Sequence, residues 1–130
     1  MHDRTILNNL RVLVVDDHKD TRDLLHFFLQ AHGATATLAD NVPEALDLIS
    51  KDRPDVVLSD ISMPGYNGYA LVAAIREQKA AMPIVALTAY TTDQDREMAL
   101  SSGFSEYVPK PFEPEELIAA LKKVCHIPAS

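Results

Sequence analysis

Five short apolar runs alternate along the chain with five amphipathic segments, and this alternation constrains the fold more than any other feature. Three of the runs are continuous stretches of Val, Ile, Leu or Ala, as expected for parallel strands covered on both faces. The segment 35–38 instead alternates polar and apolar residues, which is typical of an edge strand. The runs occupy residues 12–15, 36–38, 56–58, 84–87 and 107–108.

The segments between the apolar runs repeat apolar residues at the 3.6-residue period of an amphipathic helix. Asn41 stands where its side chain can cap one helix. Gly33 and Gly103 stand just past two others, where a left-handed residue ends a helix at low cost. Residues 93–102 form the least apolar segment, so we expect that helix to be the most exposed. In the clearest case the apolar residues are Val42, Ala45, Leu46 and Ile49.

Strands that alternate with helices predict a single α/β domain with right-handed crossovers. The doubly wound, flavodoxin-like solution is a five-stranded parallel sheet of order 2-1-3-4-5 with five helices. We place the domain at residues 11–125, with a lead-in at 1–10 and a tail at 126–130. Ligands of such sheets bind beyond the carboxyl ends of the strands, where the strand order reverses.

Composition argues against several classes of partner. The formal net charge of −7 argues against direct binding to nucleic acid or to anionic lipid. No apolar run approaches the ~20 residues that span a bilayer, so we expect no membrane segment. The single cysteine, Cys125, cannot form an intramolecular disulfide, which fits a reducing, cytoplasmic location.

Carboxylate, hydroxyl and ammonium side chains stand at the ends of four predicted strands. These residues are Asp16 and Asp17 after the first strand, Asp60 after the third, Thr88 after the fourth and Lys110 after the fifth. Two carboxylates ~4 Å apart repel by about 4 kcal/mol at an effective dielectric of 20, so the cluster favours a hard cation such as Mg²⁺. Beside a metal, Asp60 can act as a nucleophile and form an acyl phosphate, which Lys110 and Thr88 can contact.

Each of these residues alone also fits a simpler structural role. An Asp after an apolar strand is common in turns and helix caps, a Lys-Pro pair is common in loops, and a lone Thr carries no information. However, four strand ends carry groups that suit one site, in the order that the fold predicts. This combination favours a phosphoryl-transfer site over coincidence.

The chain also resembles, over nearly its whole length, the receiver (CheY-like) domain of two-component response regulators. It is most similar to the receivers of hybrid sensor histidine kinases, and residues 7–11 and 87–90 contribute to that likeness. The motifs that carry the resemblance are residues 14–17 (VVDD), 59–65 (SDISMPG), 67–69 (NGY), 87–89 (LTA) and 107–112 (YVPKPF).

The resemblance implies a role for each residue of the acidic site. Asp60 would accept a phosphoryl group from the phosphohistidine of a partner kinase. Asp17 would bind Mg²⁺ directly and Asp16 mainly through water, and the backbone carbonyl of Ser62 would be a further ligand. His18 follows the acidic pair, but Mg²⁺ prefers oxygen, so we do not expect it to be a ligand.

Further positions resemble the switch and tuning residues of the family. Thr88 and Tyr107 correspond to the hydroxyl–aromatic pair that couples phosphorylation to the face of the fourth helix, fifth strand and fifth helix. Ser62 and Tyr90 occupy positions that tune the lifetime of the phosphate, and we expect bulky Tyr90 to shield it from water. Lys110–Pro111 corresponds to a cis peptide.

Together these features predict a signalling phosphoacceptor rather than an enzyme with an external substrate. Its partners would be a histidine kinase or a histidine phosphotransfer domain, and a downstream protein or a second copy at the switched face. One rival is a haloacid-dehalogenase-like phosphatase, but that class needs an Asp-x-Asp motif where this chain has Asp16-Asp17-His18. The other is a receiver that acts without phosphorylation, although such domains usually lose an acidic residue, the Thr or the Lys.

Overall fold

A five-stranded parallel sheet forms the centre of the molecule, with strand order β2-β1-β3-β4-β5. The computed structural model of the 130-residue chain describes residues 7–61, 68–78, 81–89 and 92–126. The predicted order is confirmed, and β2 lies at an edge of the sheet as its alternating sequence indicated. The strands are β1 (Arg11–Val15), β2 (Thr35–Ala39), β3 (Val56–Asp60), β4 (Ile84–Thr88) and β5 (Glu106–Pro109).

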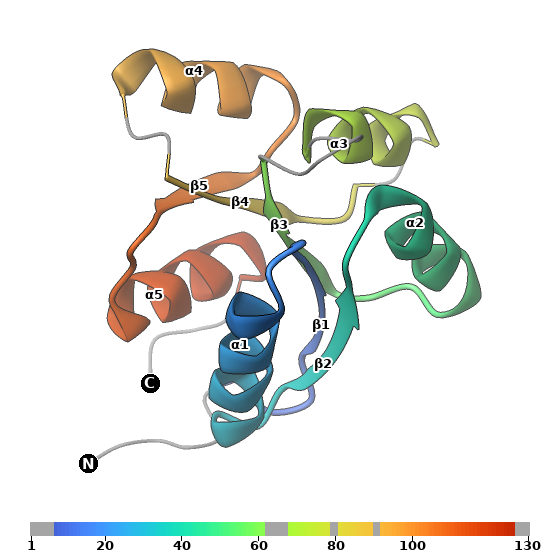
Figure 1. Ribbon diagram of the computed structural model, residues 1–130, viewed down its shortest axis with the longest axis vertical. Helices are drawn as coiled ribbons and strands as arrows, with labels where there is room; N and C mark the ends of the chain where they lie inside the picture. The colour runs from blue at the N-terminus through green and yellow to red at the C-terminus, as the bar shows by residue number, and fades with distance from the viewer. Residues whose placement is uncertain (1–6, 62–67, 79–80, 90–91, 127–130) are drawn as a thin grey trace.

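Helices cover both faces of this sheet and make a three-layer molecule (Figure 1). On one face lie α1 and α5, and on the other lie α2, α3 and α4 (Figure 1). The helices are α1 (Lys19–Ala31), α2 (Val42–Lys51), α3 (Gly68–Glu77), α4 (Asp93–Ser101) and α5 (Pro114–Val124). The flavodoxin-like fold that the sequence predicted is therefore the observed one.

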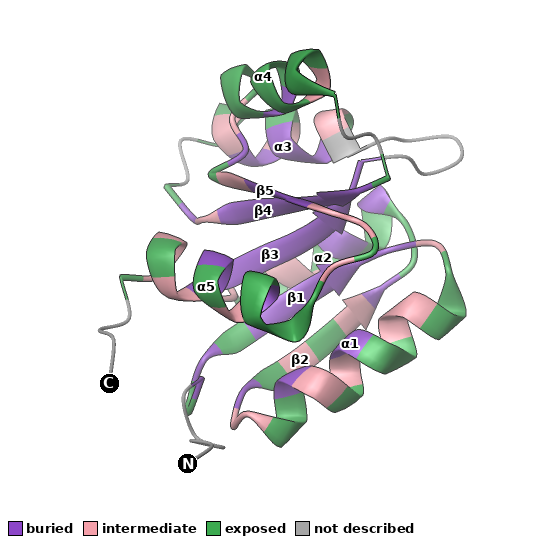
Figure 2. Cartoon of the chain, turned by 90° about the vertical axis from the view of Figure 1, so that its left-hand side faces the viewer, coloured by how far each residue is buried: buried purple, intermediate pink, exposed green. Residues whose placement is uncertain are grey.

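The hydrophobic core is divided by the sheet into two clusters, because successive residues of a strand point to opposite faces. In β1, Val12 and Val14 pack with α1 and α5, whereas Leu13 and Val15 pack with α2 and α3. The strands β3 and β4 are buried along their whole length (Figure 2). This explains why their sequences are continuous apolar runs without alternation.

Local signals in the sequence set several helix ends. The Asn41 side chain accepts a hydrogen bond from the Glu44 backbone N–H at 2.8 Å, as an N-cap does. Gly33 and Gly103 adopt φ angles of 93° and 117°, in the left-handed region that glycine enters most easily. The exposure of α4 also follows the prediction, since Ala99 is its only fully buried residue among those described.

Residues 7–10, counted with the lead-in, are part of the packed domain. Leu7 is 1% exposed and lies in the cluster beneath α1 and α5. Its backbone N–H donates to the carbonyl of His32 at 3.0 Å, which ties this segment to the end of α1. None of the described helices combines the length and apolar character that a bilayer crossing requires.

Candidate functional site

The register of the sheet brings the polar strand ends to one edge. Ser59 of β3 is the partner of Val15 in β1, and Asp60 is the partner of Leu87 in β4. Thr88 in turn pairs with Pro109 of β5. The residues that follow these pairs therefore leave the sheet at the same level, at the point where the strand order reverses.

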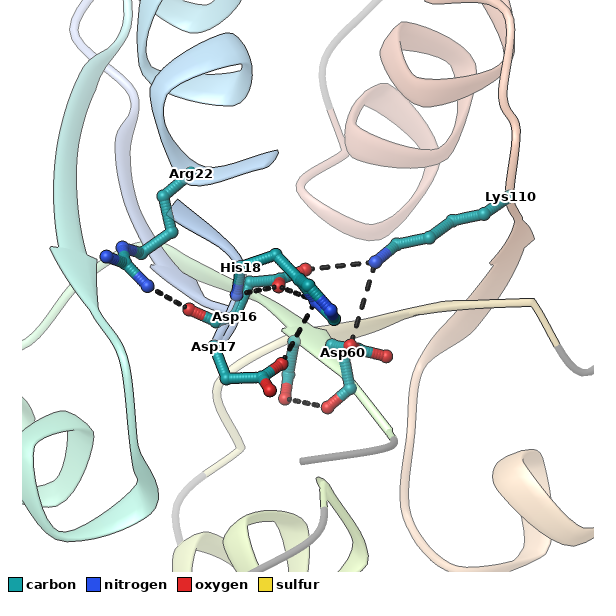
Figure 3. Close-up of polar contacts among 7 residues, drawn as sticks. Asp16, Asp17, His18, Arg22, Asp60 and Lys110 are labelled. Carbon is teal, nitrogen blue, oxygen red and sulfur yellow. Dashed lines mark hydrogen bonds and ion pairs between the residues drawn. The ribbon is translucent and has the colours of Figure 1, made fainter. Parts of the chain in front are cut away.

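Three carboxylates and one imidazole meet at this edge (Figure 3). Asp16, Asp17, His18 and Asp60 each offer one ligand atom, and these atoms all lie within 4.8 Å of one another. Asp16 is 1% exposed and Asp60 is 5% exposed, whereas Asp17 is half-buried at the rim. The structure thus brings together the acidic residues that the sequence predicted from two separate strands.

Lys110 supplies the positive charge of the site from the end of β5. Its Nζ lies 2.9 Å from Asp16 Oδ2 and 3.7 Å from Asp60 Oδ2 (Figure 3). Its backbone N–H donates to the carbonyl of Thr88 at 2.8 Å, which joins the ends of β4 and β5. The Lys110–Pro111 peptide is cis, as the resemblance implied.

His18, which follows the acidic pair in the sequence, lies against both of its carboxylates. Its backbone N–H donates to Asp16 Oδ1 at 2.8 Å. Its Nδ1 lies 3.2 Å from one carboxylate oxygen of Asp16 and 3.2 Å from one of Asp17. The imidazole is otherwise largely exposed, so it covers the rim of the site rather than its interior.

The donor set fits a divalent cation that prefers oxygen. Asp17 Oδ1 is shielded from solvent and, although His18 Nδ1 lies 3.2 Å from it, it forms no hydrogen bond with any residue that the structure describes. A shielded carboxylate oxygen without a donor is costly unless a cation balances it. Asp16 and Asp60 add oxygens within reach of the same point. Mg²⁺ commonly binds one or two carboxylates and keeps several waters, which suits this open, oxygen-rich group.

The two residues predicted as a switch pair lie on neighbouring strands. Thr88 is fully buried at the end of β4. Tyr107 of β5 is 8% exposed and packs in the cluster beneath α3 and α4. Burial raises the pKa of Tyr107, and the charge of Asp95 on α4 adds to that effect. The Tyr107 ring is therefore turned into the molecule, next to α4.

Beside Tyr107, a carboxylate links the helices on either side of β5. Glu106 lies 2.9 Å from Lys123 of α5 and 3.9 Å from Arg96 of α4. Burial would raise the pKa of Glu106, but the hydrogen bonds from Lys123 and from the Tyr107 backbone, together with the charge of Arg96, lower it below its usual value. Glu106 is therefore an ionised residue that joins α4, β5 and α5.

Two of the predicted site residues cannot be placed. Ser62 and Tyr90 lie outside the described residues, so the metal-ligand role of the first and the tuning roles of both stay predictions. Conversely, the structure adds Arg22 of α1, whose guanidinium donates to the backbone carbonyl of Asp16 at 2.8 Å. Nothing in the sequence marked Arg22, because a contact to a backbone carbonyl leaves no pattern of residue types.

Comparison with known proteins gives this arrangement a family. Residues 12–122 match the family described as the response regulator receiver domain. The chain therefore belongs to the receiver domain family of two-component signalling proteins, whose members are signalling domains.

Individual relatives agree with this assignment. A 14.6 kDa uncharacterized protein of Leptolyngbya boryana is 44% identical over 92% of each chain. The response regulator MprA of Mycolicibacterium vanbaalenii is 40% identical over 87% of this chain, which spans only 49% of that protein. The chain thus corresponds to about half the length of the MprA proteins that it matches.

Solved structures show the same fold. The receiver domain of the Francisella response regulator 1452 superposes with a TM-score of 0.86, at 31% identity over 91% of this chain and 98% of that one. The chemotaxis protein CheY4 of Vibrio cholerae superposes with a TM-score of 0.84, at 34% identity over 89% and 98% of the two chains.

Proposed function

We propose that this chain accepts a phosphoryl group on Asp60 with the help of Mg²⁺, and passes the signal on through its α4–β5–α5 face. The donor would be the phosphohistidine of a histidine kinase or of a histidine phosphotransfer domain. The observation that carries the proposal is the meeting of Asp16, Asp17, Asp60 and Lys110 at the edge of the sheet. A receiver that acts without phosphorylation would have no need of this set.

The transfer exchanges one bond for another. A carboxylate oxygen of Asp60 attacks the phosphorus, the phosphorus–nitrogen bond of the donor imidazole breaks, and the imidazole takes up a proton as it leaves. The product is an acyl phosphate on Asp60. Mg²⁺, held by Asp16, Asp17 and Asp60, would supply positive charge to the phosphoryl oxygens.

The residues of the chain itself hold and balance the transferred group. Lys110 Nζ lies 3.7 Å from Asp60 Oδ2, so its ammonium can balance the negative charge of the phosphoryl group transferred to Asp60. The Thr88 hydroxyl, buried at the end of the adjacent strand, can donate to a phosphoryl oxygen. Movement of Thr88 would open space beside the Tyr107 ring and alter α4, which buries few of its residues.

The decisive experiment is labelling with a small acyl-phosphate donor in the presence of Mg²⁺. We expect the wild-type chain to take up one phosphoryl group, detectable by intact mass, and the Asp60→Asn variant to take up none. Asp47→Asn is a matched control, since it removes the same charge from an exposed position of α2. Excess chelator should abolish labelling and leave the circular dichroism spectrum unchanged.

Three results would contradict the proposal. If Asp60→Asn is labelled as well as the wild type, the phosphoacceptor assignment is wrong. If labelling proceeds unimpaired in excess chelator, the metal has no part in the reaction. An absence of label on the wild type would favour an interaction domain that works without phosphate.

A further inference from the structure

Each polar group of Asp16, in the backbone and in the side chain, forms a hydrogen bond. Its backbone N–H donates to the carbonyl of Ala39 at 3.1 Å, which continues the ladder between β1 and β2. Its side chain accepts hydrogen bonds from the His18 backbone at 2.8 Å and from Lys110 at 2.9 Å. Its carbonyl accepts from Arg22 at 2.8 Å (Figure 3). A residue fixed in this way has little freedom to turn.

The contact from Arg22 differs from the others because it acts on the peptide that leads to Asp17. The carbonyl of Asp16 and the N–H of Asp17 belong to one planar unit, so holding the oxygen fixes the direction in which Asp17 leaves the strand. Asp17 is the carboxylate whose shielded oxygen forms no hydrogen bond with a described residue. The backbone of Asp17 therefore helps to set the direction of that oxygen, together with the His18 imidazole 3.2 Å away.

We propose that Arg22 is a positioning residue for the metal site: its hydrogen bond to the Asp16 carbonyl aims the Asp17 carboxylate and thereby sets the affinity for Mg²⁺. This inference rests on the proposed function, because it assigns a ligand role to Asp17. Partners of metal ligands commonly change metal affinity by about 10- to 100-fold when they are removed. Arg22 does not contact the Asp17 carboxylate itself, and would act on it through the Asp16–Asp17 peptide.

A competing explanation is that Arg22 contributes only its charge. Its guanidinium contacts the backbone carbonyl of Asp16, and a positive charge at that position would reduce the repulsion among the carboxylates of the metal-free site. That effect would weaken the binding of a cation, because the site would be less negative. The two explanations therefore predict opposite changes in affinity when Arg22 loses its charge.

The test measures Mg²⁺ binding by calorimetry in Arg22→Met, which keeps most of the apolar stem but removes the charge and the donors. We expect the dissociation constant to rise about tenfold. The maximal rate of labelling by a small acyl-phosphate donor at saturating Mg²⁺ should stay within about threefold of wild type, because Arg22 does not touch the reacting atoms. Arg53→Met is the matched control, as it removes one exposed charge before β3, away from the carboxyl ends of the strands.

Two further variants separate geometry from charge and from folding. Arg22→Lys keeps the charge on a shorter side chain with a different donor geometry, so we expect its affinity to stay close to that of Arg22→Met. If Arg22→Met does not fold, as judged by its thermal transition, Arg22→Gln replaces it in the same comparison. A selective loss of metal affinity with a retained maximal rate is not what general destabilisation produces.

The inference is overturned if Arg22→Met binds Mg²⁺ as tightly as the wild type or more tightly, or if Arg22→Lys restores wild-type affinity in full. It is also overturned if the maximal rate falls as much as the affinity. A different result would count against the proposed function instead: a wild-type chain that neither binds Mg²⁺ nor becomes labelled.

Discussion

Asp16 and Asp17 are adjacent and chemically identical, yet their surroundings give them different tasks. Asp16 is buried and accepts hydrogen bonds from His18 and Lys110. Asp17 lies at the rim, and its shielded oxygen forms no hydrogen bond with a described residue, although His18 Nδ1 is 3.2 Å away. A cation near this pair therefore gains more from Asp17, whose oxygen has no hydrogen bond to give up. This difference depends on packing, so the two residue types alone did not indicate it, and only the resemblance to receiver domains distinguished Asp17 from Asp16.

At Tyr107 the structure predicts a gain in stability from a conservative change. Its hydroxyl is buried and has no hydrogen-bond partner in the described part of the chain. A buried polar group without a partner costs about 1–3 kcal/mol, so Tyr107→Phe should stabilise the fold by roughly 1 kcal/mol, or about 4 °C in midpoint. Thermal unfolding measures this, with half-buried Tyr69→Phe as the control that should change little. A clear loss of stability in Tyr107→Phe would mean that the hydroxyl is hydrogen-bonded in solution.

Cys125 provides a prediction about pH. Burial, with a smaller effect from the charge of Asp55, raises the pKa of its thiol from 9.0 to about 11. Alkylation at pH 8 should therefore be roughly 100-fold slower in the folded chain than in the chain unfolded by urea, since the thiolate is the reactive form. Between pH 9 and about pH 11 only the unfolded thiol has ionised, so stability should fall as pH rises through this window.

A Cys125→Ser variant controls for the alkaline effect, because the other groups that titrate in this range remain. The part of the fall in stability that the wild type shows and Cys125→Ser does not show is due to ionisation of the Cys125 thiol. Equal alkylation rates in the folded and unfolded chains at pH 8 would show that Cys125 is not protected by burial.

At the scale of the elements, the apolar patterns predicted all five strands, three of them as the continuous runs of buried parallel strands. The strand order followed from the doubly wound arrangement of alternating strands and helices. The cap at Asn41 and the left-handed Gly33 and Gly103 were also readable, since each depends on local backbone geometry. The burial of Leu7 was not predicted, because it depends on packing between the segment before β1 and residues of α1 and α5. Local sequence does not encode such a long-range contact.

The helix α1 and the loop after β5 enclose an apolar groove beside the acidic site. The groove has a volume of about 490 Å³, and Leu24, Phe28, Lys110 and Phe112 are among its lining residues. Leu24 is 61% exposed, although it is apolar. Lys110 belongs to both the groove and the site, so we expect a protein donor that reaches Asp60 to cover this rim.

The variant Leu24→Ser should therefore distinguish protein donors from small ones. Loss of a leucine that becomes buried in the complex costs about 1.5–3 kcal/mol, so transfer from a phosphorylated kinase or phosphotransfer domain should slow by roughly tenfold or more. Labelling by a small acyl phosphate should not change. Met98→Ser, which alters an exposed apolar residue of α4 on the other face, is the matched control for the transfer rate. Equal slowing with both donors would place the defect in the site and not in docking.

At the scale of the whole molecule, the carboxylates that would bind a cation also destabilise the fold, because they repel one another. The chain carries a net charge of −7, and three carboxylates of the site lie close together with Lys110 as their nearest ammonium among the described residues. The apolar clusters on both faces of the sheet must hold these charges together when no cation is present. Binding of a cation should then stabilise the entire fold, since the site forms only when the strands are aligned.

We therefore expect Mg²⁺ to raise the unfolding midpoint. At 100 times its dissociation constant, a ligand specific for the folded state adds about 2.7 kcal/mol, which corresponds to roughly 10 °C for a chain of this size. The Asp17→Asn variant should lose most of this shift, and without metal it should be at least as stable as the wild type because one repelling carboxylate is gone. Calorimetric scans with and without Mg²⁺, at an ionic strength matched with NaCl, measure both effects. An equal Mg²⁺ shift in Asp17→Asn would show that the stabilising cation binds elsewhere on the acidic surface.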